Sequence, residues 1–88
     1  MRERDIEKAL CERVKELGGL CEKFVSPNKR NVPDRIVTLS SGKIIFVELK
    51  APNKRLTKAQ ERDHERRRKL GCDVRLINSL EAANAFPF

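Results

Sequence analysis

The segment from Glu3 to Leu17 repeats apolar residues every three or four positions. These residues are Ile6, Ala9, Leu10, Val14 and Leu17. Because an α-helix has about 3.6 residues per turn, this spacing places most of them on one face. Two glycines follow Leu17, as is typical of a helix end. The pattern predicts a first helix, with Glu7 at the border of its buried face.

Two more helices are predicted in the second half of the chain. Thr57, followed three residues later by Gln60, has the form of a capping box, and Gly71 is a suitable stop, so a helix is expected between them. Ser79 is a favourable N-cap for a short third helix, which Pro87 ends.

Four short segments have the composition of β-strands. They are residues 20–25, 34–39, 43–50 and 74–77. A turn at residues 40–42 joins the second and third of these as a hairpin. The run from Ile44 to Val47 is apolar on both faces, as in a central strand. The resulting order, α-β-β-β-α-β-α, predicts an α/β fold with a mixed sheet flanked by helices.

The length and charge of the chain narrow its class. The chain has 88 residues, enough for one small domain, so residues 1–88 are expected to form a single domain. No apolar run approaches the ~20 residues of a membrane-spanning helix, and no secretory signal is visible, so we expect a cytoplasmic protein. The formal net charge of +7 favours a polyanionic partner, nucleic acid ahead of a membrane surface.

Missing residue types exclude several kinds of enzyme. The chain has no tyrosine or tryptophan and a single histidine, which excludes a tyrosine nucleophile and any metal site with two imidazole ligands. The three cysteines, Cys11, Cys21 and Cys72, form no Cys-x-x-Cys pair, so we expect reduced thiols without a catalytic role. His64 is expected on the surface of the second helix.

Two acidic residues and a lysine gather on the predicted hairpin. Asp34 begins one strand, and Glu48 and Lys50 end the other with their side chains on the same face. Two carboxylates can hold Mg²⁺ while leaving positions for water and phosphate, and a lysine can neutralise charge that develops on the phosphate. Glu-x-Lys alone is common surface charge. Its position at the end of a buried strand, beside Asp34, favours a site that hydrolyses phosphodiesters.

The relative position of these carboxylates depends on the hairpin turn. A two-residue turn would place Arg35 opposite Glu48, as in a simple salt bridge. A three-residue turn with Gly42 in the left-handed conformation would place Asp34 opposite Glu48. Because a shared metal needs both carboxylates on one face, we predict the second register, or a bulge with the same result.

Several short motifs follow one another in a specific order along nearly the whole chain. They are Ile6-Glu7-x-x-Leu10, Gly18-Gly19, Val32-Pro33-Asp34, Gly42, Val47-Glu48-Leu49-Lys50-Ala51-Pro52, Leu56-Thr57-x-x-Gln60 and Leu70-Gly71. In this combination the chain resembles the virus-type replication-repair nuclease (VRR-NUC) domain, a branch of the PD-(D/E)xK nuclease superfamily. The resemblance implies a restriction-endonuclease-like fold. Arg67 departs from it, because that position is usually apolar.

The resemblance also implies roles for the residues of the hairpin. Asp34 and Glu48 would bind a divalent metal, Mg²⁺ with Mn²⁺ as a substitute, and the carbonyl of Leu49 would be a further ligand. Lys50 would position or activate the attacking water.

Other residues would act around this centre. Glu7 resembles the acidic residue on the first helix of the family, and Gln60 resembles the glutamine on its second helix; both would support the site. The alternative for Glu7 is a solvated glutamate at the edge of the helix. The alternative for Gln60 is a residue that only caps its helix. Basic residues flank the site as candidate phosphate contacts. They are Lys29, Arg30, Arg35, Lys54, Arg55 and Lys58. The basic run at 62–69 stays ambiguous, because acidic residues within it could pair with it along the helix.

The implied function is an endonuclease selective for DNA structure. A free-standing domain of this size is expected to act as a homodimer on branched DNA such as a four-way (Holliday) junction, as a prokaryotic protein or a viral protein in the host cytoplasm. The sheet edge and the first helix are favoured as the dimer face, because the charges of the second helix would repel their symmetry mates. The alternative is a non-catalytic nucleic-acid-binding accessory protein. A sequence-specific restriction-type enzyme is disfavoured, because there is no room for a recognition subdomain.

Overall fold

The computed structural model describes residues 1–88 and contains the seven elements in the predicted order. The elements are α1 (Glu3–Glu16), β1 (Leu20–Lys23), β2 (Arg35–Thr38), β3 (Ile44–Leu49), α2 (Lys58–Lys69), β4 (Asp73–Ile77) and α3 (Leu80–Ala85). The capping box of Thr57 and the Ser79 N-cap both form, so local side-chain chemistry starts two of the helices where it was expected to. None of the helices combines the length and the apolar character that a membrane span requires.

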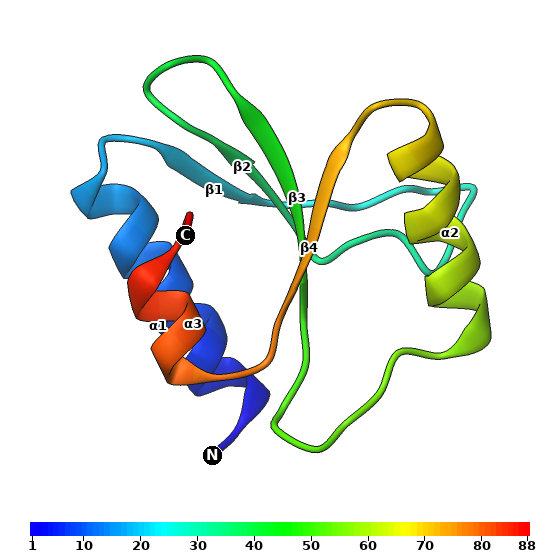
Figure 1. Ribbon diagram of the computed structural model, residues 1–88, viewed down its shortest axis with the longest axis horizontal. Helices are drawn as coiled ribbons and strands as arrows, with labels where there is room; N and C mark the ends of the chain where they lie inside the picture. The colour runs from blue at the N-terminus through cyan, green and yellow to red at the C-terminus, as the bar shows by residue number, and fades with distance from the viewer.

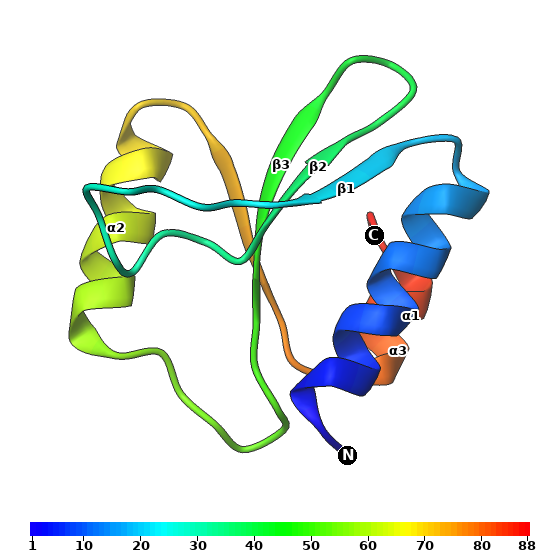
Figure 2. The ribbon, with the colours of Figure 1, turned by 180° about the vertical axis from the view of Figure 1, so that it is seen from behind.

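The four strands form one mixed sheet in the order β1-β2-β3-β4. Strand β2 is antiparallel to both β1 and β3, whereas β4 is parallel to β3 and is reached through α2. Helices α1 and α3 lie side by side on one face of the sheet and α2 lies on the other (Figures 1 and 2). The predicted α/β architecture is therefore confirmed, with β3 as a central strand.

Side chains of β3 alternate between these two layers. Ile45, Val47 and Leu49 are buried in the core that α1 and α3 cover. Phe46 and Glu48 point to the opposite face, towards α2, because successive strand residues alternate. Because Ile45, Val47 and Leu49 are buried on one face of β3, the residues between them must point to the other face, towards α2.

The hairpin adopts the register that was predicted from the site. Arg35 pairs with Val47 across β2 and β3, so the preceding Asp34 lies at the level of Glu48. Gly42 has a φ of +89°, the left-handed conformation that the three-residue turn requires. The register with Arg35 opposite Glu48 is not found. Asp34 and Glu48 therefore share the α2 face of the sheet.

Helix α2 is attached to the sheet mainly by polar groups. Its buried residues are Asp63 and His64. Arg67 donates from Nε to Asp63 at 2.8 Å, and its guanidinium lies 5.0 Å from the ring centre of Phe24 and 5.2 Å from that of Phe46. These cation–π contacts explain how an arginine takes a position where the resemblance led us to expect an apolar residue.

Replacing Arg67 by alanine should therefore destabilise the fold by about 1–2 kcal/mol, because it removes two cation–π contacts and leaves Asp63 without its partner. Urea denaturation measures this effect. Arg62→Ala, an exposed change on the same helix, is the control. Equal stability of the two variants would contradict the proposed anchoring.

The cysteines are free thiols, as expected. Cys11 on α1 and Cys21 on β1 lie with their sulfurs 3.2 Å apart, which joins the helix to the edge strand inside the partly buried layer. Cys72 follows α2 in the turn that leads to β4.

Candidate active site

Asp34 and Glu48 meet at the end of β3. Oδ2 of Asp34 accepts a hydrogen bond from the backbone N–H of Leu49 at 2.8 Å, which ties the carboxylate of the first strand to the chain directly after Glu48. The next residue, Lys50, is half-buried, and its N–H donates to Ile77 on β4. The predicted Glu48 and Lys50 therefore lie at the end of β3, and Asp34, directly before β2, is tied to the same strand end by its hydrogen bond.

Glu48 is an unusual carboxyl group, because it is only 2% exposed. Burial, followed by the hydrogen bond and negative charge of Asp34, raises the pKa of Glu48 to about 8, against a smaller opposing effect of Lys50. Without a cation, Glu48 therefore keeps its proton at neutral pH. A bound divalent cation would replace that proton.

His64 is placed differently from the prediction. It was expected on the surface of the second helix, but its side chain is fully buried against the sheet. Nε2 of His64 lies 3.4 Å from Oε1 of Glu48. Burial, and then the positive charge of Arg68, lower the pKa of His64, so the imidazole is neutral at pH 7. The error arose because α2 has no apolar stripe to mark its inner face.

The acidic residues of α1 divide into two roles. Glu7 binds Arg35, with 3.0 Å between Oε2 and Nε, and Arg35 also donates to the carbonyl of Cys21. Arg35 was a candidate phosphate contact, but its side chain is 14% exposed and faces α1, so the structure assigns it to Glu7 instead. Its position follows from strand alternation, since Asp34 faces the other layer.

Glu3 is the α1 residue that the sequence analysis missed. Burial and then the charge of Asp34 raise the pKa of Glu3, and the charge of Glu3 in turn contributes to the raised pKa of Glu48. Glu3 stands one helical turn before Glu7, and this four-residue spacing was the available signal. The start of α1 and the end of β3 lie at the same end of the molecule in both ribbon views (Figures 1 and 2).

Gln60 serves as a capping residue. Its Oε1 accepts from the N–H of Thr57 at 2.9 Å, while its own N–H donates to the Thr57 hydroxyl at 3.1 Å. The structure gives it no hydrogen bond to Asp34, Glu48 or Lys50. This arrangement is the alternative that was kept open for Gln60.

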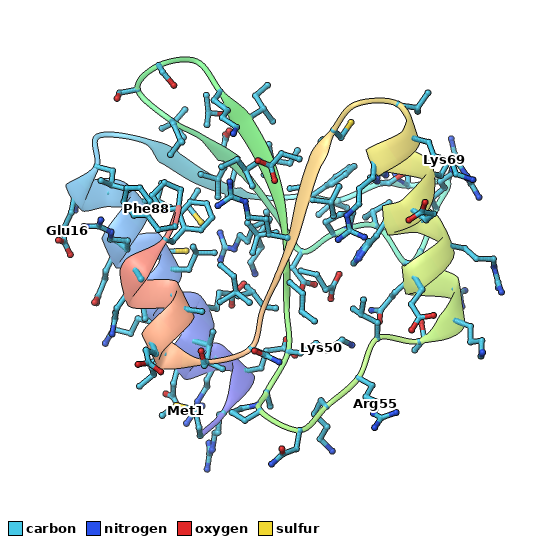
Figure 3. All side chains as sticks on the ribbon, viewed as in Figure 1. Met1, Glu16, Lys50, Arg55, Lys69 and Phe88 are labelled. Carbon is cyan, nitrogen blue, oxygen red and sulfur yellow. The ribbon has the colours of Figure 1, made fainter.

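The basic residues other than Arg35 remain on the surface around the site. Lys29 and Arg30 are exposed on the segment between β1 and β2. Lys54, Arg55 and Lys58 are exposed where β3 connects to α2. Figure 3 shows Lys50 near the start of this connection and Arg55 farther along it, with its side chain directed outwards. Both approaches to Asp34 and Glu48 are therefore positively charged.

The donor set fits an oxygen-binding cation. No cluster of three or more His, Cys, Asp or Glu side chains is poised to hold a metal, which argues against a closed protein cage of the zinc type. Mg²⁺ needs fewer protein ligands, because it binds through one or two carboxylates and keeps several waters. The carboxyl group of Glu48 is buried, and Asp34 lies next to it. This close pair of carboxyl groups is what such a cation would neutralise.

The raised pKa of Glu48 predicts how stability depends on pH in the absence of metal. Between its ordinary value of 4.5 and its folded value of about 8, the folded chain holds a proton that the unfolded chain releases, so the free energy of unfolding falls as the pH rises. His64 has a lowered pKa and opposes this trend only below about its ordinary value of 6.5. From pH 6.5 to 8 we expect a loss of about 2 kcal/mol.

Urea titrations in EDTA across this range test that expectation. The Glu48→Gln variant is the matched control, because it keeps the shape of the side chain and removes the titration. Parallel pH profiles for the two proteins would show that Glu48 does not carry the effect.

Comparisons with known proteins agree with this geometry. The family model described as "VRR-NUC domain" matches residues 2–81. The chain is 47% identical over 87 residues to "Putative nuclease p44" of Acyrthosiphon pisum secondary endosymbiont phage 1, covering 99% of this chain and 94% of that protein. A solved structure described as "VRR_NUC domain" superposes with a TM-score of 0.87 and 36% identity, over 93% of this chain and 89% of that one. Because sequence and structure agree over nearly the whole length, the chain belongs to the VRR-NUC domain family.

Proposed function

We propose that residues 1–88 act as a single domain that hydrolyses DNA phosphodiester bonds with Mg²⁺, for which Mn²⁺ can substitute. The main observation behind this proposal is the hydrogen bond between Asp34 and the backbone of Leu49. It brings Asp34 beside Glu48 at the end of β3. The family is that of a nuclease domain, and the phage relative carries a nuclease name.

Each residue of the site has a role in this proposal. Asp34 and Glu48 hold the cation, with the carbonyl of Leu49 as a further ligand. A bound divalent cation supplies Lewis-acid stabilisation of the phosphate and favours deprotonation of a water. Lys50 positions the attacking water and compensates charge on the reacting phosphate. Glu3 lies on α1 beside this centre, and Glu7 keeps Arg35 in place on the other face of the sheet.

The proposed substrate is branched DNA. The exposed basic residues on both sides of the site offer contacts to the phosphate backbone, which give affinity without reading the base sequence. Those residues are Lys29, Arg30, Lys54, Arg55 and Lys58. A non-catalytic accessory protein is the second candidate, and it is disfavoured because the carboxylates and the lysine are all present and assembled. The phage origin of the relative supports action in the cytoplasm of a host cell.

Cleavage assays test the proposal directly. Purified protein is incubated with fluorescent linear, flap, splayed and four-way DNA, with Mg²⁺ or with EDTA. We expect metal-dependent cutting that is fastest on branched forms. Binding of all these forms with no cutting in Mg²⁺ or Mn²⁺ would favour the accessory protein instead.

We also predict a two-fold homodimer. Resolution of a symmetric four-way junction needs two incisions, and one chain offers one site. The exposed apolar Leu20 on the edge strand β1 supports an interface at the sheet edge and α1, since covering it would add buried surface to a small core. Light scattering at micromolar concentration and moderate salt should give about twice the chain mass of 10.1 kDa. A monomer that still cuts both sides of a junction would contradict the prediction.

A further inference from the structure

Four basic side chains from two distant parts of the chain line one groove. Lys29 and Arg30 come from the segment before β2, and Arg62 and Arg66 come from α2. The groove has a volume of about 230 Å³, and all four residues are exposed. None of the four takes part in an ion pair or a side-chain hydrogen bond. Four uncompensated positive charges therefore surround one surface depression.

The structure resolves the ambiguity of the basic run on α2. Arg67 is bound to Asp63, and Arg68 donates to the carbonyl of Val74 at 2.9 Å, so both serve the fold. Arg62 and Arg66, one helical turn apart, line the groove and also border a neighbouring depression on α2 that contains Glu61 and Glu65. Asp63 also lines this groove, but Arg67 already neutralises it. The groove is thus positive after every internal pair has been counted.

Two short connections place the groove beside the active site. Asn31 lines it with a φ of +41°, and three residues later the chain reaches Asp34. On the helix, the residue after Asp63 is His64, which contacts Glu48. If one phosphate of a DNA strand lies at the carboxylates, a nearby phosphate of the same strand would therefore lie at the groove.

We propose that this groove binds an internal phosphate of the DNA backbone next to the phosphate that is cleaved. The inference rests on the proposed function and extends it to Arg62 and Arg66. Guanidinium groups bind phosphate oxygens in a bidentate manner, and paired contacts from a loop and a helix would fix the position of the backbone without reading bases.

A charge-matched comparison tests the groove. The double variant Arg62→Ala/Arg66→Ala is compared with Lys8→Ala/Lys15→Ala, which removes two exposed charges from α1 on the opposite layer. Binding to fluorescent duplex and four-way DNA is measured in EDTA at several salt concentrations. We expect the groove variant to bind about tenfold or more weakly than the control, with a log–log salt slope smaller by roughly 2.

The substrates carry either a 5′-hydroxyl or a 5′-phosphate to separate internal from terminal contacts. Equal losses for both support an internal phosphate, whereas a loss confined to the 5′-phosphate substrate would overturn the proposal. It would also be overturned if the groove variant behaved like the control while the unmodified protein bound and cut DNA. Failure of the unmodified protein to cut any DNA would instead refute the proposed function.

A second inference rests on buried polar atoms between α2 and β3. Oε1 of Glu48 and both ring nitrogens of His64 are buried, and none has a hydrogen-bond partner within normal geometry. The shortest approach among them is the 3.4 Å between Nε2 and Oε1. Since buried polar groups are costly when unpaired, the two side chains are each other's available partner.

We infer that His64 is a positioning residue for Glu48. With its proton on Nε2, the imidazole donates to Oε1 of Glu48, which leaves the other carboxylate oxygen for the cation that Glu48 and Asp34 would share. The inference rests on the proposed function. Groups that orient metal-binding carboxylates in this way typically change metal affinity or activity about 10- to 100-fold when they are removed.

Two substitutions separate positioning from packing. His64→Gln keeps an amide nitrogen near the position of Nε2, whereas His64→Asn places its amide nearer the backbone. We expect Mn²⁺ affinity by calorimetry, and cleavage rate, to fall about 10- to 100-fold for His64→Asn and to be largely kept by His64→Gln. Equal losses in two variants that remain folded by circular dichroism would indicate packing alone.

Nuclear magnetic resonance of the unmodified protein gives an independent readout. His64 is the only histidine of the chain, so its ¹⁵N-labelled ring can be assigned without mutation. We expect the tautomer protonated at Nε2 in the metal-free protein. The Nδ1-protonated tautomer would overturn the inference, even if the unmodified protein binds Mn²⁺ and cuts DNA.

Discussion

Replacing Glu48 by glutamine should abolish DNA cleavage and leave DNA binding intact. The substitution removes one of two negative charges that would hold the cation and keeps the shape of a buried side chain. Metal stabilisation of the reacting phosphate is worth several kcal/mol, so a loss of roughly a thousandfold or more in rate is expected. Asp34→Asn should have a similar effect, because Asp34 lies at the same strand end.

Single-turnover cleavage of a labelled four-way junction measures this loss, and gel-shift titration in EDTA measures binding. The basic groove and the β3–α2 connection are unchanged in both variants, so their affinity for DNA should match that of the unmodified protein. Undiminished cutting by either variant would refute the site.

Replacing Lys50 by alanine should reduce the cleavage rate by about a hundredfold to ten-thousandfold, the usual contribution of a positioned acid–base group. Lys50 directly follows β3, two residues after Glu48, and its positive charge counteracts part of the rise in the pKa of Glu48. A cation does not ligate a cation, so Mn²⁺ affinity should be largely retained. The two measurements together distinguish a role in chemistry from a role in metal binding.

Calorimetry with Mn²⁺ and single-turnover kinetics provide these measurements on the same preparation. Lys8→Ala, an exposed change on α1, controls for the loss of one positive charge. A Lys50→Ala variant that loses metal affinity and activity in parallel would show that Lys50 organises the carboxylates and does not act in the chemical step.

The element order and the hairpin register could be predicted because their signals are local. Apolar spacing, the capping box at Thr57 and the left-handed Gly42 each depend on a few neighbouring residues. Asp34 and Glu48 could be placed together from the same information, since a strand period of two and one turn length determine their shared face.

The surroundings of the site could not be predicted in the same way, because they depend on contacts between layers. His64 lies on a helix whose inner face is polar, so no hydrophobic pattern marks it as buried. The basic residues at 62–69 look alike in sequence, yet packing separates those that hold the fold from those that line the groove. Arg35 was the exception. Its alternation with Asp34 already indicated that it faces α1.

Separating α1 from the sheet should cost more free energy than separating α2 from it. Separating α1 from the sheet would expose Ile6, Leu10 and Val14, which are completely buried. Lifting α2 would expose Asp63, His64 and Glu48, which water can solvate, together with the two phenylalanine rings that contact Arg67. The apolar core under α1 thus supports the strands that carry the carboxylates. Arg62 and Arg66 lie on α2, the helix that separates from the sheet more easily. Tilting α2 to follow a branched DNA would leave the core under α1 intact, but it would also move His64 away from Glu48.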